Sequence, residues 1–391
     1  MVWRYRHTVL ALCTLAFTAT MVARLAISPV VPAITDDFAV STGAVGLALS
    51  AMWAAYALSQ FPSGILADRY GERGIILVAV GVTALSGALL ALSPTYLAFF
   101  VLTVLLGVGS GLHYSVATTF LARHYERVGR AIGIHVSGGP LAGLVAPVAA
   151  AAVGARYGWR MAMLLGTIVA APVFVLFWLR IEPTSPAQPD VSMRSRIEPA
   201  AVRSLLARPE IRHTTFLAIG GAFTWQATAS FLPAFFIGYH GYSTAAASVV
   251  FSAYFVVHGA TNPVMGMLSD RFGRDTTAAF AFGTGIVGYG VLVFGTGVAV
   301  LAAIPLVGLA MSWGAPVQSR FIDHLSAEER ATGFGLVRTV YMLLGASGSV
   351  VVGGLADVAG WGIAFGLLVV VLVGELSLVS MPTLRRRLDS L

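Results

Sequence analysis

The stretch Gly64-Ile-Leu-Ala-Asp68-Arg69-Tyr-Gly71-Glu72-Arg73 lies between two long apolar runs, and the sequence repeats it. The second copy reads Gly266-Met-Leu-Ser-Asp270-Arg271-Phe-Gly273-Arg274-Asp275 and again lies between two apolar runs. The chain carries few other charges. A charged loop that recurs about two hundred residues later therefore indicates a duplicated bundle of membrane helices.

The composition around this repeat excludes most soluble folds. Of the 391 residues, 57% are hydrophobic and only 10% are charged, whereas a soluble domain carries about 25% charged residues. Apolar runs of roughly 20 residues are long enough to cross the hydrocarbon core of a membrane as helices. We therefore expect an all-α protein embedded in a lipid bilayer.

The charge of the chain indicates membrane orientation and argues against nucleic-acid binding. The formal net charge is +7, and all 24 basic residues are Arg, most of them in short loops. Short basic loops are typical of the cytoplasmic side of a membrane protein, whereas a nucleic-acid site needs a basic patch or stripe on one face. No nucleic-acid partner is expected.

Twelve apolar segments can be counted along the chain. They cover 8–35, 43–67, 74–92, 96–122, 131–153, 160–180, 213–237, 243–268, 275–296, 299–321, 331–355 and 361–381. The first follows Arg4 and Arg6 and is too long for the core of a signal peptide, so we expect it to be retained. The only cysteine, Cys13, lies in this segment, which excludes a disulfide within one chain.

One long polar stretch, 182–212, separates the sixth segment from the seventh. It contains five prolines and five arginines, which predicts a flexible basic linker. The predicted domains are an N-terminal six-helix bundle, 1–181, a cytoplasmic linker, 182–212, and a C-terminal six-helix bundle, 213–391.

The placement of arginine predicts the orientation. The termini, the linker and the loops with both charged stretches are rich in Arg. The alternate loops hold Asp36, Asp37, Asp357 and only Arg156 and Arg160. The positive-inside rule therefore places both termini and both charged stretches in the cytoplasm of a multi-pass plasma-membrane protein.

The two halves align over most of their length at a nearly constant offset. Matching pairs include Ser41-Thr42 with Ser243-Thr244, and Gly158-Trp159 with Gly360-Trp361. The same elements recur six helices later in the same orientation. This predicts a parallel repeat about an axis along the membrane normal.

Twelve spans, a central linker and a Gly-x-x-x-Asp-Arg-x-Gly loop in each half resemble the major facilitator superfamily. The resemblance covers nearly the whole chain. It implies two pseudo-symmetric six-helix bundles that rock around a site at the membrane midplane. It also implies a monomeric transporter of a small molecule that needs no cofactor.

The resemblance assigns the charged stretches to a conformational lock. The assigned residues are Gly64, Asp68, Arg69, Gly71, Arg73, Gly266, Asp270, Arg271, Gly273 and Arg274. Asp68 is expected near the N-terminal end of a helix of the other half, where free N–H groups favour an anion. Arg69 and Arg73 would pair with carboxylates or the last carbonyls of neighbouring helices. Gly64 and Gly71 would permit close helix approach and a tight turn.

The lock has two departures from the family pattern and one competing interpretation. Glu72 and Asp275 stand where the family usually has a basic residue. In the alternative interpretation the charges only fix the topology.

The fifth segment contains Gly139-Pro140-x-x-Gly143, which resembles a signature of proton-linked antiporters in this superfamily. Small residues permit close helix packing, and Pro140 interrupts the helical hydrogen bonds. The alternative is a packing motif that has no bearing on the direction of transport.

Arg24 and Arg338 are the most informative charges inside the predicted membrane segments. Intramembrane charges are costly and are candidates for function. The resemblance places both on helices that line the central cavity, where no carboxylate lies at comparable depth. A guanidinium without a counter-ion suits a bound anion. The structural alternatives pair Arg24 with carbonyls at Pro29 or Pro32, and Arg338 with Glu375 or the Asp68 loop.

Other candidate substrate residues are Gln226, Trp313, His113 and His258. His titrates near neutral pH, so His113 or His258 can carry a proton if transport is proton-coupled. For each of them, helix packing or an ordinary interior hydrogen bond is the competing interpretation. His135 lies closer to the membrane boundary and ranks lower.

These residues favour a secondary transporter of a small organic anion, driven by proton symport or by exchange. One alternative is a multidrug/proton antiporter, and another is a transporter-like receptor that binds without transport. Neither an enzyme motif nor His/Cys spacing for a metal is found, so no enzymatic activity and no metal site are expected.

Overall fold

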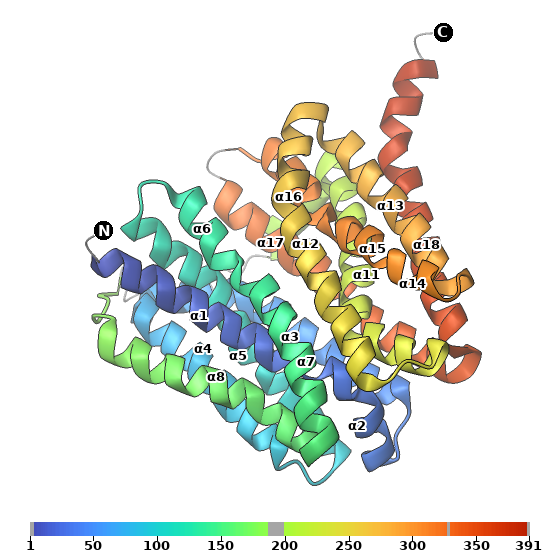
Figure 1. Cartoon of the computed structure of the whole chain (residues 1–391). Coiled ribbons are helices and arrows are strands. Elements are labelled where there is room, and N and C mark those ends of the chain that lie inside the picture. Colours follow the sequence, from blue (N-terminus) through green and yellow to red (C-terminus); the bar gives the residue numbers. More distant parts are fainter. Residues whose placement is uncertain (1–3, 187–198, 327–328, 389–391) are drawn as a thin grey trace.

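The computed structural model describes residues 4–186, 199–326 and 329–388, and these ranges form helices without strands (Figure 1). The N-terminal half contains α1 (Tyr5–Leu25), η1 (Ser28–Val30), α2 (Val31–Phe38), α3 (Thr42–Tyr70), α4 (Glu72–Ala91), α5 (Tyr96–His124), α6 (Val128–Val136), α7 (Gly138–Tyr157) and α8 (Trp159–Arg180). The C-terminal half contains α10 (Pro199–Ala207), α11 (Pro209–His240), α12 (Thr244–Phe272), α13 (Arg274–Phe294), α14 (Val298–Ala302), α15 (Ile304–Ala310), η2 (Met311–Trp313), α16 (Gly314–His324), α17 (Arg330–Gly345) and α18 (Ser347–Leu388).

These elements form the twelve predicted segments, and several segments are broken. The first consists of α1, η1 and α2, and it breaks beside Pro29. The fifth consists of α6 and α7, which meet at Ser137. Pro140 lies three residues further on and has no N–H to donate to the carbonyl of residue 136. The predicted interruption of the fifth helix is therefore confirmed.

The eleventh segment consists of α17 and the first part of the long helix α18, and the twelfth is the part of α18 that follows the non-helical Gly360. By length and hydropathy, ten helical stretches in the described ranges qualify as membrane spans, and Gly333–Met381 counts there as one of them. Helix α11 is not among the ten. It has 32 residues, so it is about 48 Å long, which exceeds the roughly 30 Å of a hydrocarbon core.

The sequence repeat produces a repeat of backbone conformation. Gly71 and Gly273 end α3 and α12 with φ of 83° and 92°, and Gly158 and Gly360 have φ of 86° and 83°. Positive φ strains any residue with a Cβ, which explains glycine at these four positions. The two halves therefore share their turns as well as their helices.

The predicted linker is only partly a linker. Residues 187–198 lie outside the described ranges, but α10 and the start of α11 fall within 182–212. Pro209 occupies the first turn of α11, where a missing N–H does no harm. Proline in this stretch therefore begins a helix as well as marking a loop, and part of the predicted linker is helical.

The two ends of the molecule differ in the charged residues that they carry. The Asp-Arg face is the end that carries Asp68 and Asp270, and the Asp357 face is the opposite end, where α3 and α12 begin. The halves lie side by side (Figure 1) and touch chiefly through α3 against α17 and α18, and through α7 against α12. One hydrophobic core crosses between the halves, and a second, which includes Ala67, Ile75 and Leu121, is confined to the N-terminal half.

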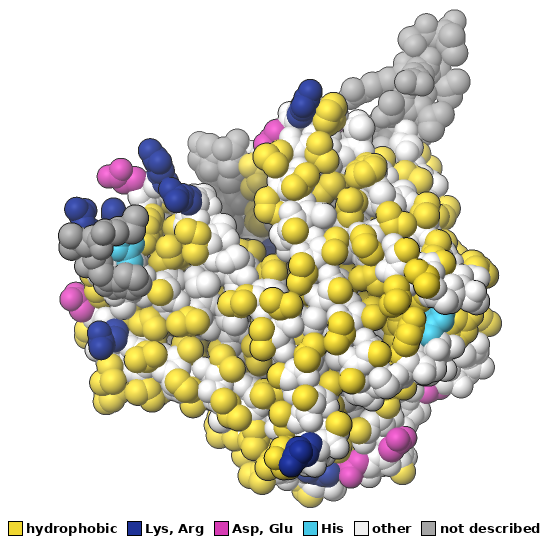
Figure 2. Space-filling view, in the orientation of Figure 1, with side chains coloured by type: hydrophobic (Ala, Val, Ile, Leu, Met, Phe, Trp, Pro, Cys, Tyr) yellow, Lys and Arg dark blue, Asp and Glu magenta, His cyan; other side chains and the backbone are white. Residues whose placement is uncertain are grey.

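The surface agrees with a membrane location. Figure 2 shows Arg, Asp and Glu side chains gathered at the two ends of the molecule and a broad, mainly hydrophobic belt between them. Large apolar side chains are exposed in that belt, for example Ile168 (62% exposed) and Val370 (67%). In water such a belt is unfavourable, and in lipid it is the expected surface.

Candidate substrate site between the two halves

Arg24 lies at the end of α1, immediately before the break at Pro29, and is 3% exposed. Its Nε donates to the Thr20 carbonyl at 3.1 Å. The guanidinium lies over two rings of α3, at 4.9 Å from the centre of Trp53 and 4.3 Å from that of Tyr56. An Arg has five N–H donors, so donors remain for a ligand. The structural alternative places Arg24 on the carbonyls at Pro29 or Pro32, but its Nε donates to the Thr20 carbonyl instead.

Arg338 approaches from α17 in the other half. Its guanidinium lies 4.4 Å from the ring centre of Tyr114 on α5, and its Nε is buried without a hydrogen-bond partner. Tyr341, one helical turn further along α17, and Tyr56 also act on it electrostatically. Arg338 therefore makes its contacts with tyrosines of both halves.

Tyr56 connects the two arginines, because it contacts Arg24 and also acts electrostatically on Arg338. Among the described residues, neither guanidinium forms an ion pair with a carboxylate. A buried charge normally needs such a partner. The arrangement can therefore accept an anion between two cations that aromatic rings hold in place.

Glu375, one structural alternative for Arg338, lies elsewhere. It is 5% exposed and packs against α11 at Gly220, where a side chain would collide with the carboxyl group. Among the described residues it forms no ion pair. Its carboxyl group is therefore buried against α11.

Aromatic side chains continue the site across the interface. Trp225 of α11 meets Trp53 edge to face at 5.3 Å between ring centres. Trp313, in η2, packs 6.4 Å from Tyr341, and its Nε1 is buried without a partner. Trp313 is thus brought near Arg338 through Tyr341.

Gln226 faces α17 and is fully buried. Its amide nitrogen donates to the Met342 carbonyl at 3.2 Å, and its Oε1 has no partner. The unpaired oxygen is an acceptor at the interface of α11 and α17. The side chain is therefore anchored at one end and open at the other.

The structure separates the two predicted histidines. His113 on α5 is completely buried beside His135 on α6, with ring centres 5.5 Å apart. His258 lies within the C-terminal half, where its ring is 3.4 Å from the hydroxyl of Ser312 and stacks on Tyr254. The charge of Arg24 acts on His113, whereas in the part of the chain that the structure describes no contact joins His258 to either arginine. His135 ranks below His258 from the sequence, but it lies beside His113 and Tyr114 and is therefore closer to the site than His258.

Sequence reasoning undervalued three tyrosines, Tyr56, Tyr114 and Tyr341. A usable signal existed for two of them. Tyr56 follows Trp53 by three residues and Tyr341 follows Arg338 by three, which places each pair on one helix face. Tyr114 carries no such signal, because its contact with Arg338 crosses between the halves.

The halves are joined toward the Asp357 face. Both carboxylate oxygens of Asp357 on α18 accept backbone N–H bonds at the start of α3, from Thr42 at 2.9 Å and from Gly43 at 2.6 Å. Deeper in, the Ser50 hydroxyl donates to the Ala346 carbonyl at 2.6 Å, and Ser28 donates to the Ser230 carbonyl at 2.8 Å. These bonds hold the two halves together toward that face.

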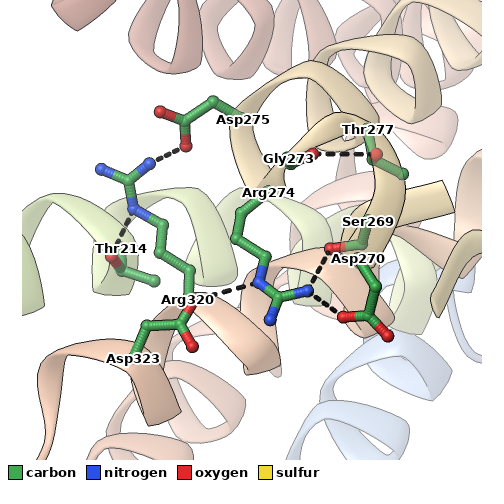
Figure 3. A network of polar contacts seen from close by, with 9 residues as sticks. All are labelled: Thr214, Ser269, Asp270, Gly273, Arg274, Asp275, Thr277, Arg320 and Asp323. Atoms are coloured by element: carbon green, nitrogen blue, oxygen red, sulfur yellow. Dashed lines mark hydrogen bonds and ion pairs between the residues drawn. The ribbon is translucent and has the colours of Figure 1, made fainter. Parts of the chain in front are cut away.

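At the Asp-Arg face, the charges of the C-terminal half pair within that half (Figure 3). Arg274 contacts Asp323 of α16 at 2.9 Å and Asp270 at 2.5 Å. Arg320 of α16 pairs with Asp275 and donates to the Thr214 hydroxyl at 3.0 Å. Asp275, where the family usually has a basic residue, is therefore neutralised by Arg320 of the same half.

The N-terminal half follows a similar scheme at this face. Glu72, the other departure, is buried and pairs with Arg123 at the end of α5 at 2.8 Å. Arg73 donates to the Trp178 carbonyl near the end of α8 at 2.7 Å. Arg69 and Arg271 occupy equivalent places and each lies over the aromatic ring of the next residue.

Gly64 and Gly266 have open surroundings. No atom lies within 4 Å of a Cβ built on either glycine. Close helix approach at these positions is therefore absent in this conformation and stays a prediction for another one. The tight turn predicted at Gly71 is present as its positive φ.

The motif of the fifth segment lies on the contact between the halves. A Cβ on Gly143 would come within 3 Å of the Phe255 ring of α12, and a Cβ on Gly259 would come as close to Pro140. Gly139 instead faces Phe17 of α1 at ordinary contact distance. The small residues therefore permit α7 and α12 to approach each other closely.

One polar pair outside the spans has a clear electrostatic effect. Arg208, between α10 and α11, donates two hydrogen bonds to Glu329, at 2.9 and 2.5 Å. These bonds lower the pKa of Glu329 to about 2. The pair holds the start of α11 to the segment that precedes α17.

The sequence profile of the Major Facilitator Superfamily matches residues 11–249 and 214–387. The chain belongs to the Major Facilitator Superfamily. A bacterial homologue of the human lysosomal transporter Spinster, solved in an inward-facing and unoccupied conformation, superposes with a TM-score of 0.80 at 19% identity over 97% of both chains. At that identity the likeness shows the fold.

Two relatives of the superfamily share part of their sequence with the chain. The hexuronate transporter of Bacillus subtilis is 26% identical over 42% of this chain and 39% of the relative. The membrane sensor protein UhpC of Escherichia coli is 28% identical over 48% of this chain and 44% of the relative. The match thus spans less than half the length of either relative.

Proposed function

We propose that the chain is a secondary transporter that moves a small organic anion across the plasma membrane by alternating access. The observation that carries the proposal is a pair of arginines at the interface of the halves. Arg24 comes from one half and Arg338 from the other, Tyr56 contacts Arg24 and acts electrostatically on Arg338, and neither arginine pairs with a carboxylate in the described ranges. An anion bound there interacts with both halves at once, as a rocking mechanism requires.

The proposed conformation is inward-facing. The hydrogen bonds between the halves gather toward the Asp357 face, whereas the ion pairs of Glu72, Asp270, Asp275 and Asp323 at the Asp-Arg face each lie within one half. Tyr5 and Glu182 meet at the same end as Arg73 and Trp178. The start of the chain and the start of the linker therefore share the Asp-Arg face, which we assign to the cytoplasm by its Arg content.

The proposed moving units are the halves 1–181 and 213–391, joined by 182–212. In the outward-facing state the Asp-Arg face closes, and Gly64 and Gly266, now without neighbours within 4 Å, pack against the opposite half. Asp68 and Arg69, with the equivalent Asp270 and Arg271, then act as the lock.

The proposal is consistent with a hexuronate transporter among the relatives, because a hexuronate is a carboxylate. It differs from a multidrug/proton antiporter in the charge of the site, since a cationic drug would meet two arginines. A receptor without transport is the second candidate, because a membrane sensor protein is also a relative. Binding without movement through the membrane would identify it.

The test uses purified full-length chain and four probes: glucuronate, benzoate, tetraphenylphosphonium and glucose. We expect thermal stabilisation by one of the two anions and its uptake into proteoliposomes. Hydrogen bonds to a charged group contribute about 1.5–3 kcal/mol. Arg24→Gln and Arg338→Gln should therefore each weaken anion binding by roughly 10- to 150-fold.

The control variant is Arg156→Gln. It removes the same charge from an exposed side chain that bonds only Tyr157 among the described residues. Its anion affinity should match that of the wild type. Stabilisation by the cation alone, or full uptake by Arg24→Gln, would refute the anion site. Binding of an anion without uptake would support a receptor.

A further inference from the structure

Two buried histidines, His113 on α5 and His135 on α6, lie beside the proposed anion site. We infer that His113 and His135 together form a proton-binding site that couples one proton to each anion carried. This inference rests on the proposed function, because the anion must bind at Arg24 and Arg338.

The two rings form a compact buried pair. Both are fully buried, their centres are 5.5 Å apart, and Phe17 of α1 covers them at 6.2 Å and 5.1 Å. Neither nitrogen of His113 has a hydrogen-bond partner. His135 faces the backbone of Cys13, although no hydrogen bond of normal geometry forms there. Buried polar atoms are rarely left unpaired, so four such nitrogens in one place require an explanation.

The pair contacts the anion site from two sides. The positive charge of Arg24 acts on His113. On the other side, the His135 ring lies 6.1 Å from that of Tyr114, and Tyr114 is the ring under Arg338. An anion that binds between the arginines therefore interacts electrostatically with the two histidines.

The surroundings of the pair are positive or neutral. The titratable or charged groups that face it are Cys13 and Arg24 from α1, Tyr114 from α5 and, beyond Tyr114, Arg338 from α17. Among the described residues, no carboxylate forms an ion pair with either histidine. Within the described ranges no carboxylate offsets the positive charge around the pair, and a bound anion would do so.

This arrangement links proton and anion. With the site empty, two guanidinium charges oppose a third positive charge on the imidazoles. A bound anion offsets the guanidinium charges, so a proton can join the pair, and by reciprocity the proton strengthens anion binding. The proton comes from the water on the side where the anion enters and leaves with it on the other side. A monoanion then crosses together with one proton, without net charge.

The test counts protons taken up when an anion binds. Glucuronate and benzoate are titrated into the purified full-length chain by calorimetry, in buffers of different ionisation enthalpy. We expect the wild type to take up about one proton per anion, because the bound anion offsets the guanidinium charges that oppose protonation of the pair. His113→Gln and His135→Gln should each lose this uptake and keep anion affinity within about tenfold.

His240→Gln is the matched control. Its ring bonds the Leu292 carbonyl in the C-terminal half, remote from the pair, so its proton uptake should equal that of the wild type. Anion binding with no proton uptake, or with uptake unchanged in both His113→Gln and His135→Gln, overturns the inference and leaves the anion site standing. If neither anion binds, the proposed function and the inference both fail. If one variant does not fold, the other decides.

Discussion

The contact between Asp357 and the start of α3 should control how readily the Asp357 face opens. Helix α3 begins with N–H groups that have no partner within the helix, and three of them are satisfied by side chains. Thr42 and Gly43 donate to Asp357 from the other half, and Ala44 donates to Ser41. When the face opens, the bonds to Asp357 are lost and the bond to Ser41 is kept. Asp357→Asn should therefore shift the equilibrium toward the open state.

The size of the shift follows from these bonds. A hydrogen bond to a charged group contributes about 1.5–3 kcal/mol, and a neutral one about 0.5–1.5 kcal/mol. Asparagine keeps one neutral acceptor and loses the charge and the second bond. Because Asp357 is exposed, the lower end applies, and we expect a loss of about 1.5 kcal/mol. That is roughly a tenfold change in the ratio of open to closed molecules.

The assay is a pulsed electron paramagnetic resonance distance between spin labels on the two halves. Labels are placed at Asp36→Cys and Val358→Cys, which are exposed positions, in a background with Cys13→Ser, because Cys13 is the only native cysteine. The fraction of long distances should rise in Asp357→Asn.

The control is Asp37→Asn, which removes the same charge from a side chain paired with Arg160 at 2.8 Å within the N-terminal half. It should leave the distribution unchanged. The reasoning is refuted if Asp357→Asn also leaves it unchanged, or if the two variants shift it equally.

Three further predictions follow from local geometry. Gly143→Ala places a Cβ within 3 Å of Phe255, so it should raise the long-distance fraction as Asp357→Asn does, whereas Gly133→Ala, with no neighbour within 4 Å, should not. Gly71→Ala imposes a side chain at φ 83°, so it should cost about 1–2 kcal/mol of stability and lower the Tm. Gly74→Ala, which lies in a helix with open surroundings, should not lower the Tm. Equal Tm values for the two variants would contradict the backbone strain at Gly71. Arg208 lowers the pKa of Glu329 to about 2, below the unfolded value of about 4.3; the pair therefore stabilises the fold above about pH 4.3 and loses that effect as the pH falls toward about 2. The Tm difference between wild type and Arg208→Gln should shrink over that pH range, and a constant difference would argue against the pair.

Local chemistry in the sequence predicted much of the fold. Gly71 and Gly273 indicate the same turn in the two halves, because a backbone position with positive φ favours glycine wherever it occurs. Pro140 predicts the break between α6 and α7, because a missing N–H disrupts the helix in any context. The linker prediction was less successful, because proline is also compatible with a helix start, as Pro209 shows.

The candidate site was only half predictable. Arg24 and Arg338 stand out in the sequence, because a charge in an apolar segment is rare and costly. Their partners do not stand out. Tyr114 contacts Arg338 across the interface, and His135 joins His113 from the next helix. Such contacts depend on how helices from distant parts of the chain pack, and no local pattern encodes that.

The sequence by itself determined the class of the protein, its twelve segments and its twofold repeat, because hydrophobic length and backbone conformation are local properties. The tertiary structure alone decided what the charges contact. It brings Arg24 and Arg338 to one tyrosine, buries Glu375 against Gly220, and places Asp357 on the first turn of α3. Each of these contacts joins residues far apart in the chain, and an electrostatic interaction depends on distance in space.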